Sequence, residues 1–352
     1  MKEPKKDVKI EFRKPIYPIS EELMAYLEKY NRTTVSPLLY DDLLRFCDYT
    51  SVEDKEGNDT LWLSVYYTEW EHSEIENSLN RIYTLLHSDG DKESLPYLKV
   101  DSIEFCTFGN SKPFRVRVRN VLNDNYTNFY VKKADASRIY GLELEDMLSP
   151  HRVNYMVYRD TLIEEHILGI PGDIFIKKHL PKCSDLEKSQ IAKEFVKFNE
   201  RCMVGLLGDM RSYNYVVVVT HDYDQIVYRI RAIDFDQQCY EGNLKIYLPQ
   251  YFKENNEMVR LVDEKLKPNS VEQYRKEVRS LIARRIMNSY KRYQDLIKIM
   301  KEDEIAPLAN VVQLRTHLQK LTYSFHFKHC KNMGEIVDTG IEFVVKNYRK
   351  PI

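Results

Sequence analysis

The stretch LGDMRSYNYVVVV at residues 207–219, followed by YRIRAIDFD at residues 228–236, decides the fold of this chain. A short polar loop leads into a run of β-branched residues, a turn and a second strand-like run, which is the pattern of a β-hairpin. Asp209 and Asn214 lie on the loop, and Asp234 lies at the end of the second strand. The predicted hairpin therefore brings three side chains that carry oxygen to one end.

Side chains of this kind suit phosphoryl transfer from ATP. That reaction needs one carboxylate to orient or deprotonate the attacking hydroxyl, and an Asn and a second Asp to hold Mg²⁺ against the phosphates. The spacing D-x4-N, followed by a hydrophobic strand that ends in I-D-F-D, resembles the catalytic and metal-binding segments of the protein-kinase-like superfamily. The resemblance is closest to its atypical branches: aminoglycoside and choline kinases, HipA-like kinases and phosphoinositide-kinase-like enzymes.

The resemblance assigns a role to each oxygen-bearing residue. It implies that Asp209 orients or deprotonates the acceptor hydroxyl, that Asn214 and Asp234 hold Mg²⁺, and that Asp236 supports the metal or the loop. In aminoglycoside and choline kinases the loop usually reads H-G-D, whereas Leu207 stands at the histidine position here. The chain therefore lacks the histidine that often braces this loop.

A kinase-like nucleotide site also needs a hairpin that covers the phosphates and a lysine on the next strand. Residues 102–108 and 114–119 read as two strands around a turn at residues 109–113, and the second strand alternates apolar and basic residues. After another turn, residues 129–135 read FYVKKAD. This segment predicts a hydrophobic strand that carries a lysine to the nucleotide site.

The phosphate contacts are predicted from the turn and from that lysine. The turn has a single glycine, Gly109, and the backbone N–H groups of Asn110 and Ser111 are the expected phosphate contacts. Lys132 and Lys133 point to opposite faces of a strand, so alternation alone leaves both open. Lys132 is favoured, because the V-K-x-x-D pattern resembles the segment around the nucleotide lysine of lipid-kinase-like relatives.

The resemblance further implies an acidic partner for the lysine. Residues 153–168 have helical periodicity and end at a G-I-P-G stop signal. This segment carries Glu164 and Glu165, and an earlier possible helix carries Glu143 and Glu145. Any of the four could pair with the lysine, and Glu165 is ranked first.

A hinge and a long helix should come next. Residues 173–180 are predicted as the hinge strand that binds the adenine ring, with Ile176 and Lys178 at the nucleotide. The sequence S-D-L-E at residues 184–187 resembles a capping box and predicts a helix that runs to about Met203. This helix would lead directly into the loop that carries the acceptor carboxylate.

Composition places few limits on function. The 352 residues are 43% hydrophobic and 30% charged, with a net charge of −1, so no global field indicates nucleic acid as a partner. Six separated cysteines without a C-x-x-C pair argue against a disulfide scaffold or a zinc knuckle, and the H-F-K-H-C cluster at residues 326–330 is a poor metal motif.

No apolar run is long enough to span a membrane, and the N-terminal sequence does not resemble a signal peptide. A cytoplasmic location is expected.

The chain is predicted to have three parts: an N-terminal α/β extension at residues 1–95, a kinase-like N-lobe at 96–180, and a helical C-lobe at 181–352. The softest boundary is the polar stretch at residues 88–96. A strand is expected at residues 61–68. Further helices are expected at residues 20–31, 37–48, 72–87, 270–300, 309–322 and 333–348.

The sequence therefore predicts an α+β, bilobal, protein-kinase-like fold with a helical C-terminal subdomain. The resemblance implies a phosphotransferase that uses ATP and Mg²⁺ and acts on a hydroxyl of a protein, a lipid head group or a small metabolite. Two alternatives stay open at this point. One is an ATP-binding pseudokinase that acts as a regulatory module, and the other is a helical interaction protein with a chance D-x4-N.

Overall fold

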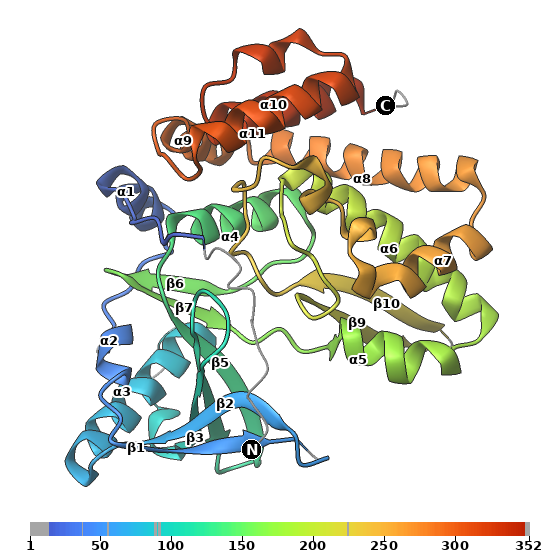
Figure 1. Cartoon of the computed structure of the whole chain (residues 1–352). Coiled ribbons are helices and arrows are strands. Elements are labelled where there is room, and N and C mark those ends of the chain that lie inside the picture. Colours follow the sequence, from blue (N-terminus) through green and yellow to red (C-terminus); the bar gives the residue numbers. More distant parts are fainter. Residues whose placement is uncertain are drawn as a thin grey trace, which may run out of the picture.

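The computed structural model describes residues 14–36, 38–54, 56–87, 90, 93–223 and 225–348. The fold is α+β, as predicted: a large antiparallel sheet lies at one end of the molecule, and helices around a small sheet form the other (Figure 1). Within the described residues, none of the helices is both long enough and apolar enough to cross a membrane.

The larger sheet has seven antiparallel strands in the order β1-β2-β3-β4-β5-β7-β6. Its strands are β1 (Asp48–Glu53), β2 (Asp59–Tyr66), β3 (Leu98–Cys106), β4 (Phe114–Asn120), β5 (Asn125–Lys133), β6 (Tyr155–Tyr158) and β7 (Thr161–Glu165). The strands predicted for residues 61–68, 102–108, 114–119 and 129–135 are confirmed. Helix α3 (Glu69–His87) packs its buried Ile75 and Leu79 into the core of this sheet.

Strand β4 shows why the alternating pattern was informative. Phe114, Val116 and Val118 are buried, and the arginines between them lie on the other face. Arg115 pairs with Glu104 on β3, so this basic stripe is matched by acids of the neighbouring strand.

The helix predicted for residues 153–168 is wrong, because this segment forms strands β6 and β7. The two strands are joined at Arg159, whose φ of 52° lies in the left-handed region. Nearly every residue of both strands is buried. A strand that is buried on both faces shows no alternation of apolar and polar residues, so periodicity could not separate it from a buried helix.

The smaller sheet contains the hairpin on which the sequence argument rests. Strands β9 (Tyr215–Asp222) and β10 (Gln225–Ala232) pair along their whole length, as predicted, and β8 (Ile170–Pro171) pairs with β9. Helix α6 (Asp185–Gly205) precedes the hairpin, and its predicted capping box forms between Ser184 and Glu187.

The hinge strand predicted for residues 173–180 is also wrong, because this segment is helical. It forms α5 (Gly172–Ile174) and two short turns at Phe175–His179 and Leu180–Lys182. Phe175 and Leu180 of this segment are both buried in the main hydrophobic core. The segment that joins the two sheets is instead residues 166–169.

The remaining helices are α1 (Glu21–Lys29), α2 (Tyr40–Leu43), α4 (Ala136–Leu148), α7 (Asn256–Lys265), α8 (Pro268–Asn288), α9 (Tyr290–Met300), α10 (Leu308–Thr322) and α11 (Met333–Asn347). The helices expected at residues 20–31, 72–87, 309–322 and 333–348 are confirmed, whereas the one expected at 37–48 is a single turn, α2. The long helix expected at 270–300 is broken at Ser289, whose backbone (φ −111°, ψ 25°) is not helical.

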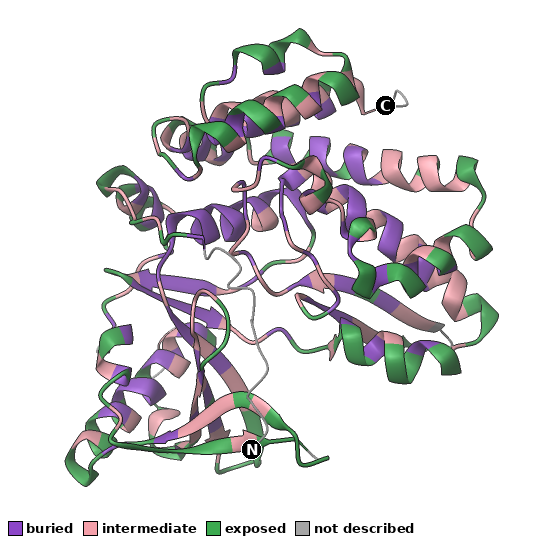
Figure 2. Ribbon diagram, viewed as in Figure 1, coloured by how far each residue is buried: buried purple, intermediate pink, exposed green. Residues whose placement is uncertain are grey.

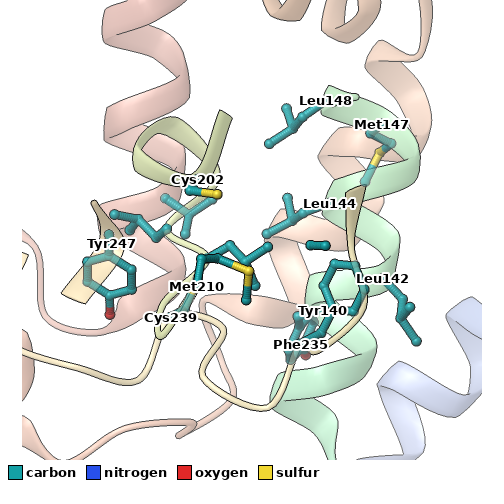
Figure 3. Close-up of a cluster of buried hydrophobic side chains, with 14 of the residues drawn as sticks. Tyr140, Leu142, Leu144, Met147, Leu148, Cys202, Met210, Phe235, Cys239 and Tyr247 are labelled. Carbon is teal, nitrogen blue, oxygen red and sulfur yellow. The ribbon is translucent and has the colours of Figure 1, made fainter. Parts of the chain in front are cut away.

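Helix α4 lies at the centre of the molecule and is buried along almost its entire length (Figure 2). Figure 3 shows Leu144 of this helix near Met210, and Tyr140 of the same helix beside Phe235; Met210 and Phe235 flank the hairpin of the smaller sheet. The packing is close: a Cβ atom built on Gly141 would lie 3.0 Å from Cβ of Phe235. The position of α4 is thus fixed by the segment that follows β10.

Glu143 on α4 connects segments that are distant in sequence. Its carboxylate accepts hydrogen bonds from Nε of Arg32 (3.0 Å) and from Nη2 of Arg292 (2.6 Å), and also from the hydroxyl of Tyr155. The N-terminal region and helix α9 are therefore both held to the same buried carboxylate.

The larger sheet continues across the predicted boundary at residue 95, since β2 hydrogen-bonds to β3. Part of the boundary stretch, residues 88, 89, 91 and 92, lies outside the described residues. The division of the chain into residues 1–95, 96–180 and 181–352 stays a prediction.

Candidate functional site

The loop between α6 and β9 is held on both sides by backbone hydrogen bonds. The N–H of Gly208 donates to the carbonyl of Gln237 (3.2 Å), and the N–H of Asp209 donates to the carbonyl of Ile246 (3.0 Å). Asp209 has a φ of 57°, in the left-handed region that Asp tolerates better than most residues. The loop is thus fixed in a tight conformation that projects from the end of α6.

Asn214 ties this loop to the end of β10. Its side-chain Nδ2 donates a hydrogen bond to the backbone carbonyl of Asp209 (2.7 Å). Its backbone carbonyl accepts a hydrogen bond from the N–H of Ile233 (3.1 Å), the residue before Asp234. Because the amide nitrogen is engaged, the oxygen of Asn214 is the atom that its side chain can offer to a cation. Hydrogen bonds therefore connect Asp209 through Asn214 to Ile233, the residue before Asp234.

The carboxylate of Asp209 lies beside an arginine from its own loop. Nε of Arg211 donates to Oδ1 of Asp209 (2.8 Å), while Nη1 of Arg211 contacts Glu254 (3.1 Å). The Asp209 side chain keeps 32% of its surface exposed, so a second molecule can reach it.

A buried arginine, Arg138, connects the two aspartates with the larger sheet. It lies in the first turn of α4 and is only 1% exposed. Its Nη1 donates to Oδ1 of Asp234 (2.8 Å) and to Oδ1 of Asp236 (2.7 Å), and its Nε and Nη2 both donate to Glu164 on β7. One guanidinium thus contacts three carboxylates from two parts of the fold.

Lys132 on β5 joins the same network. Its Nζ lies 2.7 Å from Oε2 of Glu164, and both side chains are buried. Burial would raise the pKa of Glu164, but the charges of Arg138 and Lys132 outweigh it and lower this pKa to about 2. Lys133 points to the other face and pairs with Asp160 (2.6 Å) and Asp41 (3.1 Å). The structure therefore brings Lys132, and not Lys133, to the aspartates.

The acidic partner of Lys132 is Glu164, so the ranking of Glu165 first is wrong. Lys132 is opposite Leu162 in the strand register, which places Glu164 on the same face and Glu165 on the other. Glu165 instead accepts hydrogen bonds from the backbone and side-chain nitrogens of Asn154 (2.8 and 3.0 Å).

The other two candidate acids do not pair with Lys132 either. Glu143 binds Arg32 and Arg292, as described above. Burial raises the pKa of Glu145, and Arg201 is its main counteracting charge.

The two aspartates after β10 have pKa values that shift in opposite directions. Burial, together with the neighbouring Asp236, raises the pKa of Asp234. Burial also acts to raise the pKa of Asp236, but the charges of Arg138 and Lys132 outweigh it and lower this pKa. The N–H of Asp236 donates to Oδ1 of Asp234 (3.0 Å), which fixes the two carboxylates relative to each other.

The donor set fits Mg²⁺, which prefers carboxylate and carbonyl oxygens. Arg138 contacts Oδ1 of each aspartate, and neither Oδ2 atom has a hydrogen bond within the described part of the chain. Across the described residues, no group of three or more His, Cys, Asp or Glu side chains could hold a metal ion, and this includes residues 326–330. A magnesium site here would need the oxygen of Asn214 together with Asp234 and Asp236.

Two further predicted nucleotide contacts, Gly109 and Ser111, lie outside the ion-pair network. Gly109 (φ 84°) and Ser111 lie in the turn between β3 and β4, as expected. The strand register places the base of this hairpin beside Lys132, because Phe114 on β4 is opposite both Phe105 on β3 and Val131 on β5.

The two residues predicted to bind adenine are not part of the ion-pair network around Arg138. Ile176 packs against the main core, and the exposed Lys178 pairs with Glu56 (3.3 Å). Both lie in the helical turn Phe175–His179, so the strand geometry assumed for adenine binding is absent from them.

Sequence reasoning missed two cations. Arg138 follows the V-K-K-A-D segment at the start of a helix, and that position was the only available signal. Lys14 pairs with Asp135 (2.6 Å), lies over the rings of Tyr17 and Tyr240, and helps to lower the pKa of Asp236. Nothing in the sequence around Lys14 indicated this contact.

No protein-family model matches the sequence, and none of the curated proteins is similar to it. Among solved structures, an ethanolamine kinase of Plasmodium vivax is similar to this chain at 12% identity, over 80% of this chain and 89% of that chain, with a TM-score of 0.30. A likeness this distant carries no argument about activity or substrate. The α+β architecture, with its large antiparallel sheet and helical second half, is consistent with the expected bilobal kinase-like fold.

Proposed function

We propose that this chain is an atypical kinase-like phosphotransferase, which uses ATP and Mg²⁺ to phosphorylate a hydroxyl of a protein or small molecule. The observation that carries the proposal is the continuous buried network from Lys132 through Glu164 and Arg138 to Asp234 and Asp236. It joins a strand lysine to two carboxylates beside the Asp209 loop, which is the set of groups that phosphoryl transfer needs.

Lys132 is proposed to bind the α- and β-phosphates. Glu164 holds its Nζ in place through an ion pair of 2.7 Å. The turn at Gly109 and Ser111 is proposed to cover the phosphates with backbone N–H groups. Residues 166–169, which join the two sheets, replace residues 173–180 as the proposed contact for adenine.

Asn214, Asp234 and Asp236 are proposed to hold the metal. When bound, Mg²⁺ would neutralise charge that develops on the phosphates. Asp234 and Asp236 are held by backbone and Arg138 contacts, so their oxygens need little reorganisation.

Asp209 is proposed to orient the acceptor hydroxyl and to accept its proton. The backbone contacts to Ile246 and Asn214 fix the position of this residue, and its partial exposure admits a substrate. Nε of Arg211 donates a hydrogen bond to Oδ1 of this carboxylate (2.8 Å) and so restrains its orientation.

A second candidate is an ATP-binding regulatory module without turnover. Arg138 favours it, because a guanidinium that occupies Oδ1 of both aspartates competes with a metal ion for them. Leu207, which is buried in the main core, also takes the place of the usual bracing histidine.

The two candidates are separated by measuring nucleotide binding and turnover on the same protein. ATP with Mg²⁺ should raise the melting temperature, because a ligand that binds only the folded state stabilises it. The phosphotransferase should also consume ATP slowly in the absence of acceptor. A melting temperature that millimolar ATP and Mg²⁺ leave unchanged would count against both candidates, and binding without ATP consumption would support the regulatory module.

A further inference from the structure

A cavity of about 650 Å³ lies in the helical half of the molecule, between α6, α8, α10, α11 and residues 243–251. Figure 1 shows α10 and α11 stacked above α8 and α6 in this region. None of the residues proposed for phosphoryl transfer lines the cavity. Its volume falls within the range of pockets that hold small organic ligands, so it is a second candidate site on this chain.

Most of the cavity wall is apolar. Helix α11 contributes one face, with Ile336, Val337, Phe343 and Val344 around Gly340. Apolar side chains from α6 and α10 also line the cavity. An occupant must therefore present an apolar body to gain from burial.

The charges at the cavity are mostly positive. Four basic residues and one acidic residue line it: Lys245, Arg275, Arg279, Lys320 and Glu200. Arg279 is buried and already forms an ion pair, since its Nε lies 2.6 Å from Oε1 of Glu200. Arg275 is only loosely paired, at 3.8 Å from Glu200 and 3.9 Å from Glu272, and 39% of its side chain is exposed. Of the two arginines, Arg275 is therefore the one that can bind an anionic head group.

A polar atom at the cavity also lacks a partner. Nδ1 of His317 is buried and has no hydrogen bond within the described part of the chain, and His317 lines the cavity. A buried polar atom without a partner is costly, and a ligand oxygen could satisfy it.

From the apolar wall, the basic rim and the unsatisfied histidine, we propose that this cavity binds an amphipathic carboxylate with a single apolar chain. Its chain lies against α11 around Gly340, and its carboxylate binds Arg275. This binding is separate from phosphoryl transfer and does not depend on it.

Gly340 provides the decisive variant. It lies within α11 and lines the cavity, and a Cβ atom built on it meets nothing within 4 Å. The Cβ of Gly340→Leu therefore has open space, and the rest of the side chain takes up cavity volume; leucine is also a better helix former than glycine, so the variant should fold. Gly340→Ala is the matched control, because it gains the helix preference but adds only one methyl group.

The experiment titrates dodecanoate into the full-length chain by isothermal titration calorimetry. We expect saturable one-to-one binding that Gly340→Leu weakens on the order of tenfold or more and that Gly340→Ala changes by less than about twofold, because the lost affinity follows the lost apolar contact. Arg275→Gln should weaken binding, whereas Arg284→Gln, at an exposed position on the same helix, should not.

Three results would overturn the proposal. Absence of saturable binding to the folded wild type removes the site. Equal binding by Gly340→Leu and wild type shows that dodecanoate adsorbs elsewhere. Equal binding of dodecan-1-ol and dodecanoate removes the role of Arg275 and of the carboxylate.

Discussion

Nη1 of Arg138 lies 2.8 Å from Oδ1 of Asp234, so a charged hydrogen bond fixes the first turn of α4 to the end of β10. The same nitrogen also donates a hydrogen bond to Asp236, and Nη2 of the guanidinium donates one to Glu164. Arg138 therefore contributes both to the position of α4 and to the geometry of the candidate metal site.

Arg138→Met should destabilise the protein by about 3 kcal/mol or more, because removing one partner leaves buried carboxylates uncompensated. Millimolar Mg²⁺ should restore part of this loss, since the aspartates then lack a competing cation. Urea unfolding with and without Mg²⁺ measures both effects. Arg284→Met, at an exposed position on α8, should stay within about 0.5 kcal/mol of wild type. A variant at Arg138 that Mg²⁺ leaves unchanged would argue against a metal site at these aspartates.

Asp209 and Asp234 should respond differently to substitution by asparagine. Asp209→Asn should leave binding of ATP and Mg²⁺ nearly intact but lower turnover on the order of hundredfold or more, because a positioned acid–base group is lost. Asp234→Asn should weaken the Mg²⁺-dependent binding itself. Nucleotide titration and an ATP-consumption assay on both variants measure the difference. Equal loss of binding in both would show that the roles are assigned to the wrong carboxylates.

The two adjacent lysines should separate in a thermal-shift experiment. Lys132→Ala should abolish most of the stabilisation by ATP and Mg²⁺, because its Nζ is the one held by Glu164. Lys133→Ala is the matched control, since Lys133 lies on the other face and pairs with Asp160. A larger loss in the Lys133 variant would contradict the proposed phosphate contact.

Gly141→Ala should destabilise the protein by about 1–3 kcal/mol, because its new Cβ would lie 3.0 Å from Phe235 and 3.1 Å from Gln238 in a close-packed region. Gly340→Ala has open space around its Cβ and should instead stabilise α11 by up to about 1 kcal/mol. Urea midpoints of the two variants should therefore move in opposite directions. A neutral Gly141→Ala would mean that α4 can shift away from Phe235 at little cost.

Glu164 should contribute a distinct acid sensitivity. Its pKa is about 2 in the folded protein against an ordinary value of 4.5, so its stabilising effect is present above pH 4.5 and is lost as the pH falls toward 2. The melting temperature of wild type should fall through this window. Glu164→Gln should be less stable at neutral pH and should show a shallower fall. Parallel acid profiles for the two proteins would show that other carboxylates cause the transition.

The parts of the fold that could be predicted are those with a local signal. The alternation along β4 and the loop-and-hairpin pattern around Asn214 are both visible in short windows of sequence, and both are present in the structure. The capping box at Ser184 is equally local, since its two members are three residues apart.

The parts that could not be predicted depend on tertiary contacts. Strands β6 and β7 are buried on both faces, so they lack the alternation that marks a strand. The choice of Glu164 over Glu165 requires the register between β5 and β7, which no single segment encodes. Arg138 was missed because its three carboxylate partners come from positions 26 to 98 residues further along the chain.

The carboxylate of Glu143 has a consequence for the order in which the chain can fold. Its partners Arg32 and Arg292 are 111 and 149 residues away in sequence. A ribosome must therefore add Arg292 before this buried acid has both of its arginine partners, although the helix that carries it is complete at residue 148. Contacts between such distant positions slow folding, because a long loop must close first. We therefore expect nascent chains that end before α9 to stay protease-sensitive, and to become resistant in one late step once α9 has left the exit tunnel.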